Sequence, residues 1–123
     1  QDERTFVRNS LATTLKAICA QRLVPANEEA TGTKVVPAVE VLLTSPMVRE
    51  LIRDERDTDL PSVIANSRED GMCLFTHYFA DLVNKEWITM HTAMEYAPNK
   101  DMLRSILKGV EVKAGNLVGR LKG

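Results

Sequence analysis

A stripe of large apolar side chains in the middle of the chain most limits what this sequence can fold into. Between residues 74 and 83 these side chains recur with the 3.6-residue period of an α-helix. They are Leu74, Phe75, Tyr78, Phe79, Leu82 and Val83. Because so wide a stripe must be covered along one whole side, we expect this helix to form the centre of a hydrophobic core.

Capping and breaking residues divide the rest of the chain into short helices. Ser45-Pro46 combines a favoured cap residue with proline in the first turn, and predicts a helix that ends near residues 53–54. The apolar spacing predicts further helices at residues 2–22, 60–64, 89–96 and 99–109. In the first of these, a single face carries Val7, Leu11, Leu15 and Ile18.

One segment instead has the composition of a β-strand. Residues 35–43 are rich in Val, and Pro37 within them requires an edge position or a bulge. Residues 21–24 could pair with this strand across a polar loop at residues 26–34. The alternation at 110–113 and 117–121 allows a second, terminal hairpin. The fold class predicted is therefore mainly α, a helical subdomain over residues 1–109 with one β-hairpin, followed by a basic extension over 110–123.

Composition excludes several classes of protein. The chain has 123 residues, of which 44% are apolar and 27% charged, as in one ordinary globular domain. No apolar run is long enough to cross a bilayer, and the N-terminal residues do not form a signal peptide. Cys19 and Cys73 are far apart in sequence, so we expect two reduced, partly buried thiols in a cytosolic protein, without zinc.

No sequence motif for catalysis is present. The chain lacks a glycine-rich phosphate loop, a zinc-protease motif and a nucleophile motif. His77 and His91 stand alone on predicted helices and give only weak signals. From residue chemistry alone, we expect a non-catalytic domain that holds no cofactor and no metal.

Six blocks of the sequence, in order, resemble the C-terminal part of the PilT-type pilus retraction ATPases, which belong to the type II/type IV secretion ATPases. The most specific block, Ser45-Pro46-Met47-Val48-Arg49-Glu50-Leu51-Ile52-Arg53-Asp54, is similar to the family's T-P-A-I-R-N-L-I-R-E. The other blocks are residues 8–23, 36–42, 61–64, 71–72 and 82–88. The chain departs from the family at Ala65-Asn66-Ser67, where the family has Q-T-G, and again after Gly71-Met72.

The resemblance implies a larger parent protein and a role for this part of it. The parent would be a cytoplasmic homo-hexameric ATPase at the inner membrane, and its ATP and Mg²⁺ would bind upstream of Gln1. This part would transmit ATP-driven movement to neighbouring subunits or to the pilus or secretion machinery, without membrane insertion. The motif residues implied are Met47, Val48, Arg49, Glu50, Leu51, Ile52, Arg53 and Asp54.

Two questions stay open at this point. Arg49 and Arg53 lie one helical turn apart, so they either form a solvated, salt-bridged face or contact a partner. The whole chain could instead be a winged-helix-like nucleic-acid-binding domain or a helical adaptor. Six basic against two acidic side chains in residues 100–123 favour the first of these alternatives, whereas a net charge of −1 makes nucleic acid an unlikely partner.

Overall fold

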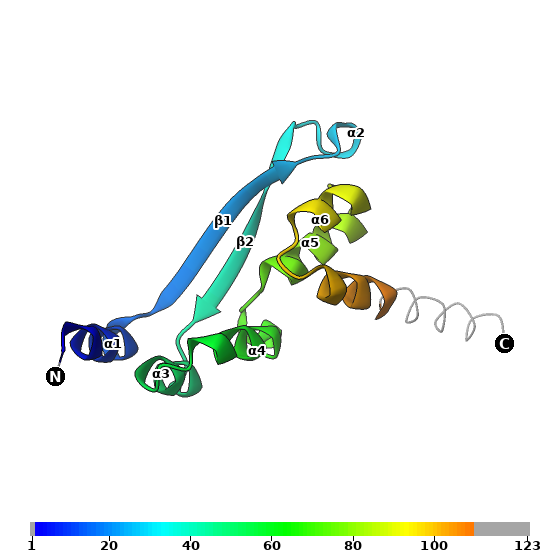
Figure 1. Ribbon diagram of the computed structural model, residues 1–123. Helices are drawn as coiled ribbons and strands as arrows, with labels where there is room; N and C mark the ends of the chain where they lie inside the picture. The colour runs from blue at the N-terminus through cyan, green and yellow to red at the C-terminus, as the bar shows by residue number, and fades with distance from the viewer. Residues whose placement is uncertain (1, 110–123) are drawn as a thin grey trace. The chain divides into compact units, whose positions relative to one another are not determined.

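The structure is a computed structural model that describes residues 2–109 of the chain. The predicted fold class is confirmed, because this part of the chain forms short helices and a single two-stranded sheet (Figure 1). The second hairpin predicted at 110–113 and 117–121 lies outside the described residues. The elements divide between two compact units, which we describe separately.

The first unit, here called the α1–α3 unit, comprises residues 2–21 and 39–74. It contains α1 (Glu3–Thr14), α3 (Pro46–Arg53), the 3₁₀ helix η1 (Asp57–Asp59), α4 (Leu60–Ala65) and the 3₁₀ helix η2 (Arg68–Asp70). Helix α1 packs along α3. The core of the unit consists of Ala12, Leu42, Val48, Ile52, Ile64 and Met72.

The second unit, here called the α5–α6 unit, comprises residues 22–38 and 75–109 of the described chain. It contains α2 (Glu28–Thr31), α5 (Phe75–Asn84), α6 (Met90–Tyr96) and a further helix over residues 100–109. Its core is built around the fully buried side chains of Phe79 and Leu103. The predicted apolar stripe thus forms the core here, except that Leu74 packs in the α1–α3 unit.

The hairpin formed by β1 (Ala17–Pro25) and β2 (Val35–Leu43) contributes to both units. Its register follows from two backbone hydrogen bonds, Thr44 N–H to Lys16 O at 3.1 Å and Ala26 N–H to Lys34 O at 2.9 Å. Both pairs belong to one continuous antiparallel ladder without a bulge. In that register Pro37 needs no hydrogen bond to β1, which is why a proline is tolerated in β2.

The helix predicted over residues 2–22 is wrong in its second half, because α1 ends at Thr14 and β1 begins at Ala17. The Thr13 and Thr14 hydroxyls donate to the carbonyls four residues earlier, an arrangement that weakens a helix end. Leu15 then adopts an extended backbone as the C-cap. Residues 26–34, predicted as a loop, contain the single-turn helix α2, which closes at Gly32 in a left-handed conformation with φ 71°.

Candidate functional site

The motif of residues 47–54 forms α3 and its C-cap, and the helix divides the motif into two faces. The Ser45 hydroxyl accepts a hydrogen bond from Val48 N–H at 3.3 Å, which fixes the helix start as predicted. The side chains of Val48, Leu51 and Ile52 are buried. The opposite face is exposed and carries Met47, Glu50, Arg53 and Asp54.

Arg49 does not lie on the exposed face with Arg53. Its guanidinium donates to the carbonyl oxygens of Ala12 and Thr13, the latter at 3.0 Å. These carbonyls belong to the last turn of α1, where the helix dipole favours a cation. Arg49 therefore caps α1 and ties it to α3. Periodicity could not predict this role, because the partner carbonyls lie 36 and 37 residues earlier in the chain.

Arg8 makes a second connection from α1, one that our sequence analysis did not single out as a site. Its guanidinium donates to both carboxylate oxygens of Asp57, at 2.9 and 2.6 Å, and to Ile52 O at 2.9 Å. The Arg8 side chain is only 17% exposed, whereas that of Asp57 is 53% exposed. The bidentate pair fixes the chain that leaves the C-terminal end of α3 against α1.

The Arg8 hydrogen bonds lower the pKa of Asp57 below its ordinary value, and the charges of Arg8 and Arg4 lower it further. A carboxyl with a lower pKa in the folded state stabilises the fold above its unfolded pKa of about 3.9 and loses that contribution as the pH falls through the folded pKa.

We therefore expect Asp57→Asn to flatten the loss of stability below about pH 4, as measured by thermal melts across an acid pH series. Arg8→Gln should reduce the loss of stability at acid pH by the same amount, and the double variant should reduce it no further. If either single variant loses stability with falling pH as steeply as the wild type, the Arg8–Asp57 pair is not the source of this pH dependence.

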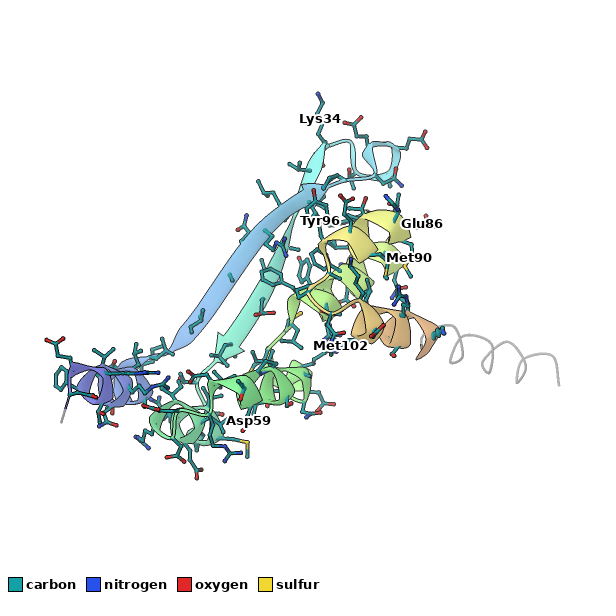
Figure 2. The ribbon with its side chains drawn as sticks, in the orientation of Figure 1. Lys34, Asp59, Glu86, Met90, Tyr96 and Met102 are labelled. Atoms are coloured by element: carbon teal, nitrogen blue, oxygen red, sulfur yellow. The ribbon has the colours of Figure 1, made fainter. Side chains whose placement is uncertain are left out.

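Arg22 is a further side chain that the sequence did not identify, and it lies in the α5–α6 unit. Its guanidinium carbon lies 5.9 Å from the ring centroids of both Phe75 and Tyr96, within the range of a cation–π interaction. The same group donates to Tyr96 O at 3.2 Å. Tyr96 is labelled at the end of α6 in Figure 2. Arg22 thus fastens β1 to α5 and α6.

The other residues considered from sequence do not gather into a reactive site. His77 lies on α5 and His91 on the exposed side of α6. Cys19 and Cys73 form no disulfide with each other, and Cys19 is exposed instead of partly buried. Within residues 2–109, no three His, Cys, Asp or Glu side chains come close enough together to hold a metal ion. None of the helices in the same range combines the length and the apolar character needed to cross a bilayer.

Comparisons with known proteins identify relatives of the chain, although no protein-family profile matches it. The chain is 34% identical over 123 residues to the type IV pilus ATPase PilU of Pseudomonas aeruginosa, a match that covers 99% of the chain and 31% of PilU. It is 29% identical over 101 residues to a twitching motility protein of Neisseria gonorrhoeae, covering 82% of the chain and 26% of that protein. The crystal structure of the pilus retraction motor PilT with bound ADP matches with a TM-score of 0.67 and 27% identity, over 85% of this chain and 27% of that one. The chain thus spans about a quarter to a third of the length of these relatives.

Proposed function

We propose that the chain is the C-terminal region of a divergent PilT-type ATPase and that it transmits movement within a pilus retraction or secretion motor. The likeness to PilU and to PilT supports this proposal. The longer protein would be a homo-hexamer at the cytoplasmic face of the inner membrane. Residues 1–109 would form its C-terminal helical subdomain, and residues 110–123 a basic extension. The partners would be neighbouring subunits and the pilus or secretion machinery.

The observation that carries this proposal is the division of the motif helix α3 between an anchored face and an exposed face. Arg49 and the Arg8–Asp57 pair fasten α3 and its C-terminal end to α1. Movement of α1 would therefore move α3 as well. The exposed Met47, Glu50, Arg53 and Asp54 offer one apolar and three charged side chains to a partner. A surface of this kind can be bound and released without disturbing the core beneath it.

We further propose that ATP and Mg²⁺ are held by another part of the longer protein. ATP binding in such motors needs a backbone phosphate cradle with a lysine, and the 123 residues contain no such sequence. The isolated chain is expected to show no micromolar affinity for MgATP in isothermal titration calorimetry. Micromolar binding would contradict the proposal that ATP and Mg²⁺ are held by another part of the longer protein.

The proposal that the chain is part of a longer ATPase can be tested by sequencing the gene upstream of the codon for Gln1. An open reading frame that continues into a sequence with G-x-x-x-x-G-K-[ST] is expected. A start codon immediately before Gln1 would overturn the proposal that the chain is part of a motor. The reading frame, once known, also supplies the longer protein for the experiments below.

A further inference from the structure

Two helices of the α5–α6 unit form a groove that the proposed function does not use. It is lined by residues of α6 and of the helix over residues 100–109, and its volume is about 560 Å³. The lining side chains, here called the α6 groove, are Met90, His91, Met94, Arg104, Leu107 and Lys108. The motif helix α3 belongs to the other unit, so the α6 groove is independent of the partner contact proposed for α3.

The apolar side chains of the α6 groove form a strip that is open on its outer side. Met94 and Leu107 are partly buried against the core of the unit. Met90, labelled on α6 in Figure 2, lies one turn before Met94 and is 43% exposed. Methionine side chains are flexible and polarisable, so they adapt to apolar side chains of different shapes. The strip is therefore suited to receive the apolar side chains of a partner.

The charged side chains of the α6 groove are all basic. Arg104 and Lys108 lie one turn apart on the helix over residues 100–109, and His91 faces the groove from α6. Glu95 follows His91 by one turn but does not line the groove. Arg104 pairs with Asp101 at 2.9 Å, yet the Asp101 side chain is 95% exposed, and so exposed a pair contributes little. The charges of the groove therefore favour an acidic occupant.

The backbone of the two helices restricts the form that this occupant can take. Within a helix, except at its ends, the backbone N–H and C=O groups bond to one another. Neither side of the α6 groove therefore offers an edge with which an extended chain could pair. A helical occupant needs no such edge, because it satisfies its own backbone, and it can present apolar side chains along one face.

We propose that the α6 groove is a docking site for an acidic amphipathic helix of a partner protein. The apolar face of that helix would cover Met90, Met94 and Leu107. Its carboxylates would pair with Arg104 and Lys108. Apolar contact would supply the affinity, and the basic side chains would select an acidic partner.

The end of this chain fits the α6 groove less well than such a partner. Residues 110–123 follow the basic helix directly and are themselves basic. Their charged residues are Lys113, Arg120 and Lys122 against Glu111. In the groove this segment would place like charges together, which an acidic partner avoids.

The test uses the full 123-residue chain and a synthetic peptide of about 18 residues, long enough to form a helix. The peptide carries leucine at helical spacing and glutamate on its other faces. Binding is followed by the methionine methyl signals in NMR spectra. The signals of Met90 and Met94 are expected to shift. That of Met47 should not, because Met47 is 59% exposed but does not line the α6 groove. A peptide with lysine in place of glutamate should shift none of the three.

Reversal of one charge tests the basic side of the groove. Lys108→Glu is expected to weaken binding of the acidic peptide at least about tenfold, because an attraction becomes a repulsion. Lys100→Glu is the matched control, since it makes the same change on the same helix outside the groove. Lys100 lies about 12 Å further along the helix axis, beyond the screening length of about 8 Å at physiological salt. It should therefore change the affinity less than about twofold.

Four results would overturn the inference. The first is an absence of shifts at Met90 and Met94 at peptide concentrations up to about 1 mM. The second is equal binding of the lysine peptide, or equal weakening by Lys100→Glu and Lys108→Glu. The third is a shift of the two methionine signals with protein concentration alone, which would place a second copy in the groove. The fourth is a shift of the same signals on Leu121→Ser without peptide, which would place the end of the chain there. None of these results bears on the motor role proposed for α3.

Discussion

Replacing Phe79 by Ala is expected to lower the free energy of unfolding by about 3–5 kcal/mol, the usual cost of deleting a buried aromatic ring. Phe79 is 0% exposed and lies at the centre of the core of the α5–α6 unit. Its ring stacks on Phe75 with centroids 6.3 Å apart. The substitution therefore leaves a cavity and removes a ring contact. Urea unfolding followed by circular dichroism measures the loss.

Phe6→Ala is the matched control for this substitution. Phe6 is 69% exposed on α1, so its removal should change the free energy of unfolding by no more than about 0.5 kcal/mol. Equal effects of the two substitutions would show that Phe79 does not occupy the core position assigned to it. The comparison removes the same side chain in both places, so the difference reports the burial of Phe79 together with its contact with Phe75.

Helix α5 could be predicted because its large apolar side chains recur at helical spacing within one short segment. Phe79 and Leu82 recur at helical spacing and are buried together on one face of α5. The partly buried Phe75, Tyr78 and Val83 pack against the same cluster. An apolar stripe this wide has few alternatives, since only a covered helix face keeps it from water.

The boundary between α1 and β1 could not be predicted by the same method. Val7 and Leu11 are on α1, whereas Ile18 is on β1, yet their spacing continues one helical period. Strand β1 also lacks the alternation of buried and exposed residues that identifies a strand, because only Val24 in it is buried.

The buried apolar residues of the candidate site could be predicted from the sequence, whereas the partners of its arginines could not. Helical spacing alone places Val48, Leu51 and Ile52 on a buried face, and the structure agrees. The partners of Arg8 and Arg49 lie on elements 36 to 49 residues away in sequence. No local pattern specifies such pairs, because they depend on how α1 packs against α3.

Substitutions along α3 are expected to separate anchoring from partner contact. Leu51→Ala should lower the free energy of unfolding by about 2–5 kcal/mol, because Leu51 is 5% exposed and a cavity would remain. Arg49→Ala should cost about 1.5 kcal/mol, because the terminal carbonyls of α1 lose a charged donor. Arg53→Ala should change stability by no more than about 0.5 kcal/mol, since Arg53 is exposed. Thermal and urea unfolding of the three variants provide the ranking.

The same three variants in the longer protein then test the role of the exposed face. Arg53→Ala is expected to reduce motor output while leaving the melting temperature unchanged, because a partner contact is lost without damage to the core. Arg49→Ala should reduce both, since α3 is no longer held to α1. Full motor output in a stable Arg53→Ala variant would show that this arginine contacts no essential partner. Equal destabilisation by Arg53→Ala and Arg49→Ala would instead show that both arginines are structural, and the exposed face would then carry no transmission role through either of them.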